Sequence, residues 1–476
     1  VRSRGLGDVY KRQVWKHKPR PVLLNSWEAC YFKIDEKKLL QLAKAGKDAG
    51  IELFVMDDGW FLGRNDDTSS LGDWEPDPKK LPGGIASLSK KIKALGMDFG
   101  LWVEPEMISE NSNLYKEHPD WAMKIPGHPH SEGRNQCILD LCNPEVRKYV
   151  IEEMTRVFSS GDIRYAKWDM NRIFSDIYAP SLPAERQGET AHRYVLGLYQ
   201  IMEELTTRFP MILFEGCSAG GNRFDLGILC YFPQIWASDN TDALCRTGIQ
   251  NSYSYGYPLS VFTAHVSSCP NHQTLRITPL ETRFQVASFG ILGYECNLKD
   301  LSGSDLNAIR EQIALYKKWR DVFQFGTFYR GTENEDSDSE TLSWTCVSPD
   351  GRRAVGLFFR RLTTPNQSHD WYRPVGLLPD VKYHFYGRNI KYNLKDFGDL
   401  VNTVSPVHIK QGSALQEILS RFVNMDGEKE DLTAYGDTLM LAGIALKPAF
   451  AGTGYNSDTR LFPDFSSRIY FMEAVE

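Results

Sequence analysis

Short apolar runs alternate with longer amphipathic runs from about residue 20 to about residue 325. The apolar runs have the length of β-strands, whereas the runs between them repeat their apolar residues at helical spacing. We expect strands at 21–27, 51–59, 98–106, 165–170, 211–217, 234–240, 259–267 and 292–298. Repeated strand–helix units of this kind predict an α/β fold, the (β/α)8 TIM barrel.

Capping residues mark the ends of the amphipathic runs. Asp35 and Asn143 precede two of these runs, and Gly50 and Gly96 close two of them, as helix termini prefer. We therefore expect helices within 35–50, 83–96, 143–160 and 191–209. A doubly wound sheet is the alternative fold, but it needs a glycine-rich phosphate turn after the first strand. The stretch "NSWEACYF" has no such turn.

The pattern changes after residue 326, where short β-rich runs are separated by Gly, Pro, Asn and Asp. We expect strands within 341–348, 353–362, 382–387, 437–446 and 467–474. This texture predicts an antiparallel β-sandwich. The predicted organisation is a catalytic barrel at 14–325 followed by a C-terminal β-sandwich domain at 326–476, with an acidic surface loop at 332–340.

The first thirteen residues, "VRSRGLGDVYKRQ", lack an initiator Met and show no clear periodicity. We interpret residues 1–13 as non-native N-terminal read-through. The chain is then expected to be a fragment whose natural upstream part is missing.

Composition excludes several classes of partner. The chain is 42% hydrophobic and 24% charged, as globular proteins are, and its net charge of -6 gives no basic surface for nucleic acid or an anionic membrane. No apolar run reaches the length of a membrane span. The nine cysteines are scattered without a CxxC pair, which favours a reduced, cytoplasmic chain without a structural zinc site.

Acidic side chains end five successive predicted strands. They are Asp57 and Asp58, Glu104 and Glu106, Asp169, Glu215, and Asp239. Each acid alone could be a helix cap or an ion-pair partner. Their recurrence at the carboxyl ends of strands, where the loops of a barrel converge, instead favours one catalytic site at the barrel mouth.

Two reactions use several carboxylates at such a mouth, metal-assisted hydrolysis and glycoside hydrolysis. Catalytic metals usually need histidine ligands, but no HxH or HExxH spacing occurs on these strands, and His265 and His272 are better explained as core or loop residues. Glycosidases need one ionised and one protonated carboxyl group, with aromatic rings against the sugar. Tryptophans beside the same strand ends suit this role: Trp27, Trp60, Trp102 and Trp236. The sequence thus favours glycoside hydrolysis without cofactor or metal.

Several motifs in the same order make this chain recognisable. They are "MDDGWF", "GLWVEPEMI", "KWDMNR", "LFEGCSAGGNRFD", "WASDNTDALCR" and "AHVSSCPNHQ". They closely resemble the bacterial retaining α-galactosidases of glycoside hydrolase family thirty-six, from about residue 20 to the C-terminus. The resemblance implies release of terminal α-D-galactose from melibiose and raffinose by double displacement. Family members carry a β-sandwich before the barrel, which has no counterpart here, and the full-length parent is expected to be a homo-oligomer, a tetramer.

The resemblance also implies roles for individual residues. Asp169 matches the nucleophile and Asp239 the acid/base, with Asp242 as the alternative acid that we expect to be structural. Lys167 before the nucleophile should lower the pKa of Asp169, and the two catalytic carboxyl groups should lie about 5–6 Å apart. The implied substrate-binding residues are Trp27, Asp57, Asp58, Trp102, Arg134, Lys167, Asn171, Cys217, Ser218 and Gly220.

Other functions on this scaffold stay open. An α-N-acetylgalactosaminidase and an α-galactosyl transferase are the enzymatic alternatives, and a non-catalytic sugar-binding fragment is the alternative from another class. In the family, the loop of Cys217 lies near the sugar O2, where an acetamido group would have little room. Asp57 and Asp58 match the family's paired aspartates that hold O4 and O6 of galactose.

Overall fold

The computed structural model describes residues 14–15, 17–131, 133–331, 340–364, 369–420, 422–450 and 459–475. The predicted read-through segment 1–13 and residues 332–339 of the predicted acidic loop lie outside these ranges. The chain divides into two compact units. The first runs to residue 241 and includes 260–273 and 290–315, and the second comprises 242–259, 274–289 and the chain from residue 316.

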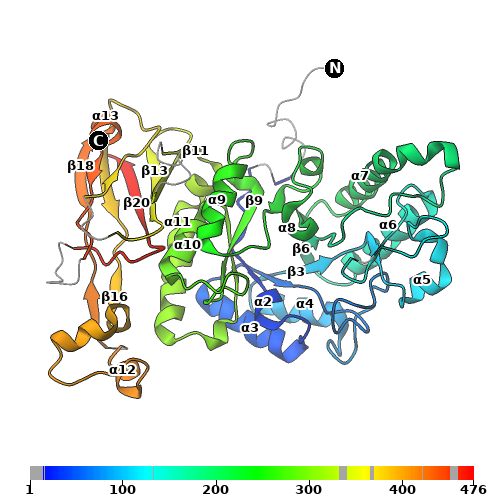
Figure 1. The fold of residues 1–476 in the computed structure, drawn as a ribbon, viewed down its shortest axis with the longest axis horizontal. Helices are drawn as coiled ribbons and strands as arrows, with labels where there is room; N and C mark the ends of the chain where they lie inside the picture. Colours follow the sequence, from blue (N-terminus) through cyan, green and yellow to red (C-terminus); the bar gives the residue numbers. More distant parts are fainter. Residues whose placement is uncertain are drawn as a thin grey trace. The chain divides into compact units, whose positions relative to one another are not determined.

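Eight parallel strands of the first unit close into a barrel in the order β1-β10-β9-β8-β7-β6-β3-β2 (Figure 1). They are β1 (Leu23–Asn25), β2 (Leu53–Met56), β3 (Asp98–Val103), β6 (Ile163–Trp168), β7 (Leu213–Gly216), β8 (Gln234–Trp236), β9 (Phe262–Ser267) and β10 (Ile291–Glu295). Each overlaps one of the predicted apolar runs, so the predicted barrel is confirmed. Its strands are buried almost throughout, as parallel strands covered on both faces are.

The described helices before residue 326 belong partly to the first unit and partly to the second. They are α2 (Trp27–Cys30), α3 (Glu36–Ala49), α4 (Gly84–Ala94), α5 (Asn113–Glu117), α6 (Pro144–Ser159), α7 (Thr190–Arg208), α8 (Ser218–Gly221), α9 (Ala243–Tyr253), α10 (Leu280–Ser288) and α11 (Gly303–Phe325). Asp35 caps α3 by accepting from Lys38 N–H, and Gly50 ends it with a left-handed φ of 100°. Asn143 likewise caps α6. These caps agree with the sequence prediction.

The second unit contains a six-stranded antiparallel sheet, in the order β11-β12-β13-β20-β15-β18 (Figure 1). Its strands are β11 (Thr327–Arg330), β12 (Thr341–Val347), β13 (Arg353–Arg360), β15 (Lys382–Gly387), β18 (Asp431–Tyr435) and β20 (Ser467–Ala474). A short second sheet pairs β14 (Trp371–Tyr372) with β19 (Ile444–Ala445). Tyr372 and Ile444 from this sheet share one core with Tyr470 and Met472 of β20, which gives the two layers of the predicted sandwich.

One predicted strand of this unit is wrong. Residues 437–446 begin as helix α13 (Gly436–Leu441), and only the last part forms strand β19. Gly443, at a φ of 77°, separates the two elements. The first part of this apolar run is a helix, in which Leu439 is buried and Leu441 is exposed. The extended segment starts only after the glycine.

A small helical subdomain lies between β15 and β18 along the chain. It comprises β16 (Lys391–Asn393), a 3₁₀ helix (Leu394–Thr403), α12 (Ala414–Leu419) and β17 (Asn424–Asp426). Leu394, Val401 and Ile409 form its core. Within the described ranges, we find no helix with both the length and the apolar character needed to cross a membrane.

Candidate active site

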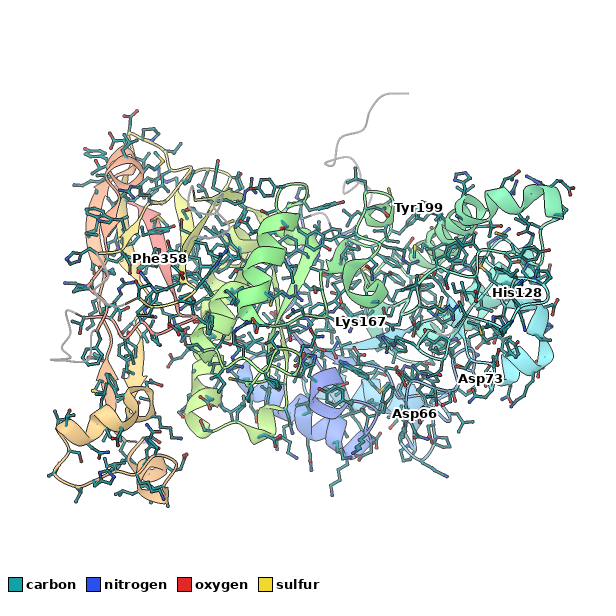
Figure 2. All side chains as sticks on the ribbon, in the orientation of Figure 1. Asp66, Asp73, His128, Lys167, Tyr199 and Phe358 are labelled. Atoms are coloured by element: carbon teal, nitrogen blue, oxygen red, sulfur yellow. The ribbon has the colours of Figure 1, made fainter. Side chains whose placement is uncertain are left out.

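A pocket opens at the carboxyl ends of the barrel strands, and its lining residues all belong to the first unit. They are Trp27, Glu28, Asp57, Asp58, Trp102, Arg134, Lys167, Asp169, Asn171, Cys217, Trp236, Asp239, His272, Gln273 and Glu295. The empty space between them is about 610 Å³, a figure that includes the open mouth of the pocket. Lys167 at the end of β6 is labelled in Figure 2.

Asp57 follows β2, lines the pocket and hydrogen-bonds to several neighbouring residues. Its Oδ2 accepts from Lys167 Nζ at 2.9 Å and from Asn25 Nδ2 at 2.7 Å. Its backbone N–H donates to Ser26 Oγ at 3.0 Å. Buried polar groups need such partners, so these contacts hold the Asp57 side chain in place in the pocket lining.

The next residue, Asp58, has a different partner. Arg64 Nε and Nη2 donate to its two oxygens at 3.0 and 2.8 Å, a two-pronged ion pair. Both side chains are buried. Burial raises the pKa of Asp58 above its ordinary value, although Arg64 opposes that effect. No motif or spacing in the sequence singled out Arg64.

Asp169 stands directly after β6 with hydrogen-bond donors around both oxygens. Asn171 Nδ2 and Trp102 Nε1 donate to Oδ2 at 2.8 and 3.2 Å, and Ala219 N–H donates to Oδ1 at 3.1 Å. Burial works against ionisation, but the charge of Lys167 and these donors outweigh it and hold the pKa below its ordinary value. The predicted direction of this shift is confirmed.

Asp239 follows β8 and lies in a different electrostatic environment. Burial and the nearby charge of Asp169 raise its pKa above the ordinary value, in that order of importance. Trp236 Nε1 donates to its Oδ1 at 2.7 Å. One pocket therefore contains two acids whose pKa values are shifted in opposite directions, the pattern that separates a nucleophile from a general acid.

The loop after β7 supports both acids through its backbone. Ser218, Ala219 and Gly220 all have positive φ values, of 59°, 48° and 79°. This turn aims Ala219 N–H at Asp169. A Cβ on Gly220 would lie only 2.7 Å from the backbone nitrogen of Asp239, so a glycine is required there.

Glu104, after β3, is fully buried behind Asp169. It accepts from the backbone N–H of Asn171, and Gln136 Nε2 lies 3.4 Å from its other oxygen. Burial first, and the charge of Asp169 second, raise the pKa of Glu104 to about 8. Glu104 is therefore, like Asp239, an acid at this end of the barrel whose pKa is raised.

Glu106 has a structural environment. Arg223 donates to its two oxygens at 2.9 and 2.7 Å, and Trp168 Nε1 and Tyr194 Oη donate at 2.8 and 2.7 Å. Arg223 Nε also donates to Ser218 Oγ at 2.7 Å. Glu106 thus links the end of β6, which carries Trp168, to Tyr194 of α7 and to Arg223 after α8.

Asp242, the alternative acid, is the N-cap of α9. Its Oδ1 accepts from Leu244 N–H and Cys245 N–H at 2.8 and 3.1 Å. Its Oδ2 pairs with Arg276 Nη1 at 2.6 Å. These partners are those of a structural carboxylate.

The structure brings most of the predicted site residues into this pocket. Ser218 and Gly220 are not among the described residues that line it, and their predicted contact with substrate stays a prediction. The pocket also contains Trp236, one of the tryptophans expected beside the sugar, and four residues for which the sequence analysis gave no site role, namely Glu28, His272, Gln273 and Glu295. Glu295 ends a barrel strand as the other acids do, so that rule could have found it.

The two histidines near the site are held by carboxylates. His265 Nδ1 lies 2.8 Å from Glu295 Oε2, and His272 Nδ1 lies 3.2 Å from Glu28 Oε1. The hydrogen bond to Glu28 raises the pKa of His272. His265 is a core residue paired with Glu295, as the sequence indicated, whereas His272 pairs with Glu28 and also lines the pocket.

Comparison with known families agrees with this architecture. Residues 6–326 match the family described as Melibiase. The chain belongs to the melibiase family. Residues 341–472 match the glycosyl hydrolase family 36 C-terminal domain, so both parts of the fold correspond to parts of known family members.

Individual relatives are similar to most of this chain. Alpha-galactosidase AgaA of Geobacillus stearothermophilus is 47% identical over 379 residues, which cover 80% of this chain and 52% of AgaA. Alpha-galactosidase 1 of Pediococcus pentosaceus is 48% identical over 372 residues, 78% of this chain and 50% of that protein. The chain spans about half the length of the curated relatives that it matches.

Solved structures show the same fold. The crystal structure of AgaA has a TM-score of 0.83 and 42% identity, over 98% of this chain and 57% of that one. A structure of an AgaA variant was determined in complex with raffinose, again with a TM-score of 0.83, at 41% identity over 98% of this chain and 57% of that one.

Proposed function

We propose that this chain is a retaining α-galactosidase that releases terminal α-D-galactose from α-galactosides such as melibiose and raffinose. The observation that carries the proposal is the opposite pKa shift of two acids in one pocket, downward for Asp169 and upward for Asp239. The names of the similar enzymes, and the raffinose in the AgaA complex, support the choice of substrate.

Each acid has one role in each step. Asp169 attacks the anomeric carbon while Asp239 gives its proton to the departing oxygen, which leaves a galactosyl ester on Asp169. Asp239, now ionised, then takes a proton from the water that cleaves this ester. Two inversions at the anomeric carbon restore its α-configuration. The donors around Asp169 hold its carboxylate in place for the attack.

Asp57 and Asp58 are the proposed receptors for the O4 and O6 hydroxyls of galactose. Both lie on one side of the pocket, and Arg64 and Lys167 fix their orientation. A buried acceptor that loses its hydroxyl partner costs roughly 1–3 kcal/mol. An epimer with the O4 hydroxyl turned away would therefore bind and react more weakly.

The proposal also covers the roles of the two domains, the location and assembly of the parent protein, and the selectivity of the pocket at Cys217. The barrel at 14–325 is the catalytic domain, and 326–476 is the C-terminal domain. The full-length parent is a cytoplasmic homo-oligomer, a tetramer. Cys217 in the pocket wall disfavours an N-acetylgalactosaminide, because its buried thiol takes the space near O2 that an acetamido group needs.

The decisive experiment compares α-galactosides with the matching α-glucosides. The unmodified chain should hydrolyse an aryl α-galactoside, melibiose and raffinose, and should release α-galactose as the first product by NMR. Asp58→Asn should reduce the galactoside-to-glucoside ratio of kcat/KM about tenfold or more, because it weakens a charge-assisted hydrogen bond. Asp66→Asn, at an exposed carboxylate in the loop after β2 (Figure 2), is the control and should leave the ratio unchanged.

A non-catalytic sugar-binding chain would bind galactose, seen as a raised melting temperature, without turnover of any substrate. An α-galactosyl transferase would transfer the galactosyl group to added sugar in preference to water. Either result would overturn the proposal.

A further inference from the structure

A second group of reactive side chains lies outside the pocket lining. One ligand atom each from Glu110, His130 and Cys137 lies within 4.8 Å of the other two. The three types of donor atom are a carboxylate oxygen, an imidazole nitrogen and a sulfur. Together they form a mixed set that suits a borderline-soft divalent cation.

Two paired strands support this group of side chains. Strands β4 (Met107–Ile108) and β5 (Cys137–Ile138) pair antiparallel, with Ile108 opposite Cys137. Glu110 comes two residues after β4, so it lies near the end of the ladder that carries Cys137. His130 comes from the loop between the two strands, and His128 of the same loop is labelled in Figure 2.

His130 has the surroundings of a metal-binding histidine. Its side chain is 8% exposed, and Nε2 lies 3.7 Å from Glu110 Oε1. Nδ1 has no hydrogen-bond partner among the described residues and lies 3.9 Å from Asp176 Oδ2. At this distance Asp176 is on the side of the second ring nitrogen, where histidine ligands have an orienting partner, but it does not hydrogen-bond to Nδ1.

The surroundings of the group include one buried ion pair. The nearby positive charge of Arg172 is balanced by Asp176, whose Oδ2 lies 2.9 Å from Nη2.

We propose that Glu110, His130 and Cys137 bind one zinc-class divalent cation, with a fourth position open to solvent beside Glu110. Binding converts the Cys137 thiol into a thiolate bonded to the cation and releases one proton to solvent. Tyr115, whose hydroxyl lies 3.3 Å from His130 Nε2, gives up this hydrogen bond to the metal bond. Glu110, 61% exposed at its side chain, provides the entry path.

Such a cation would hold the loop that carries His130 against the paired strands β4 and β5. The same loop carries Arg134, which lines the pocket and is 43% exposed at its side chain. Metal binding would hold Arg134 in place against the substrate. This second part rests on the proposed function, whereas binding of the cation does not.

The test is a metal titration of the full chain. The protein is stripped with a chelator, and zinc is then titrated in competition with a chromophoric indicator. Unmodified protein should bind one equivalent, and His130→Gln and Cys137→Ser should bind at least about tenfold more weakly, as loss of a ligand predicts. Cobalt in place of zinc should give a thiolate charge-transfer band that Cys137→Ser removes.

Two further variants keep the result interpretable. Cys142→Ser, at a nearby half-buried thiol that donates to Thr190 O, should bind like the unmodified chain. Glu110→Gln changes an exposed side chain that the fold does not need and should weaken binding even if a buried variant misfolds. Absence of stoichiometric binding, or equal binding by all variants, would overturn the site.

The effect of metal binding on substrate binding in the pocket is measured in a separate experiment. Zinc-loaded and stripped protein should differ in KM for an aryl α-galactoside at least twofold, with kcat little changed, and His130→Gln should show no difference. If the chain has no turnover at all, the titration and the cobalt spectrum still decide the metal site. Metal binding without a change in KM would overturn the coupling alone.

Discussion

Lys167 places its ammonium group 2.9 Å from Asp57 Oδ2, although it stands two residues before Asp169 in sequence. Its charge nonetheless lowers the pKa of Asp169. One buried cation thus serves two carboxylates, the proposed nucleophile and a proposed galactose receptor. Recognition and reactivity are coupled through this side chain.

We expect Lys167→Met to change both the recognition of galactose and the reactivity of Asp169. Without the cation, the pKa of Asp169 rises, so the acidic limb of kcat/KM against pH should move to higher pH. Asp57 is left as a buried carboxylate without its charge partner, which should cost roughly 3 kcal/mol of unfolding free energy. Denaturant unfolding and a pH series of kcat/KM on an aryl α-galactoside measure the two effects.

Lys93→Met is the matched control. Lys93 pairs with Asp162 on the surface, and its side chain is 63% exposed. Loss of this pair should change stability by no more than about 1 kcal/mol and leave the pH profile in place. An unmoved acidic limb in Lys167→Met would contradict the assigned coupling.

The roles of Asp239 and Asp242 can be separated by leaving groups. Asp239→Asn should lose about 10²–10⁴ in kcat/KM on raffinose, whose leaving oxygen needs a proton, and far less on an aryl galactoside with an acidic phenol. Asp242→Ala should cost about 0.5–2 kcal/mol of stability, because it removes the cap of α9. Its ratio between the two substrates should stay that of the unmodified chain. Equal losses on both substrates in Asp239→Asn would contradict its role as the acid.

Glu104 should make stability depend on pH. Its pKa is raised from 4.5 to about 8 in the folded chain, so the fold favours the protonated form. This contribution is fully present below the unfolded pKa near 4.5 and is lost as pH rises through about 8, at about 1.4 kcal/mol per pKa unit. Unfolding free energy should therefore fall between pH 5 and pH 8.

Glu104→Gln removes the titrating proton and should flatten this slope, as measured by urea unfolding at several pH values. Glu117→Gln, at an exposed residue of α5, should keep the slope of the unmodified chain. A slope that persists in Glu104→Gln would assign the pH dependence to other groups.

Gly220→Ala should reduce turnover through Asp239. The new Cβ would press on the Asp239 backbone at 2.7 Å, and a φ of 79° is unfavourable for alanine. We expect kcat on raffinose to fall about tenfold or more, with a stability loss of roughly 1–3 kcal/mol. Gly248→Ala, inside α9 with nothing within 4 Å of its added Cβ, should keep activity and gain up to about 1 kcal/mol. Unchanged kcat in Gly220→Ala would contradict the backbone coupling.

The fold was largely predictable because its signals are local. The eight barrel strands are short apolar runs, and helices such as α3 carry their own cap, Asp35. Residues 437–446 were predicted wrongly because alternating apolar residues fit a helix turn and a strand equally well. Only the positive φ of Gly443 distinguishes them.

The pocket was predictable where its residues end strands or belong to a family motif. The partners that set its electrostatics were not, because sequence spacing does not show which charged side chains meet in the fold. Arg64 reaches Asp58 from the following loop, and Lys167 reaches Asp57 across 110 positions. Sequence neighbours alone would have paired Lys167 with Asp169.

The interlocked backbones after β7 and β8 also bear on how this chain can change under selection. Besides the contact of Gly220, a Cβ on Gly221 would meet Ala237 O at 2.8 Å. Mutational libraries at these two glycines should yield almost only inactive clones. Of Cys217, Gly220 and Gly221, only Cys217 can then vary without a backbone clash. Under the proposed binding mode, with the sugar O2 near Cys217, a change of specificity at this loop should therefore start at that residue.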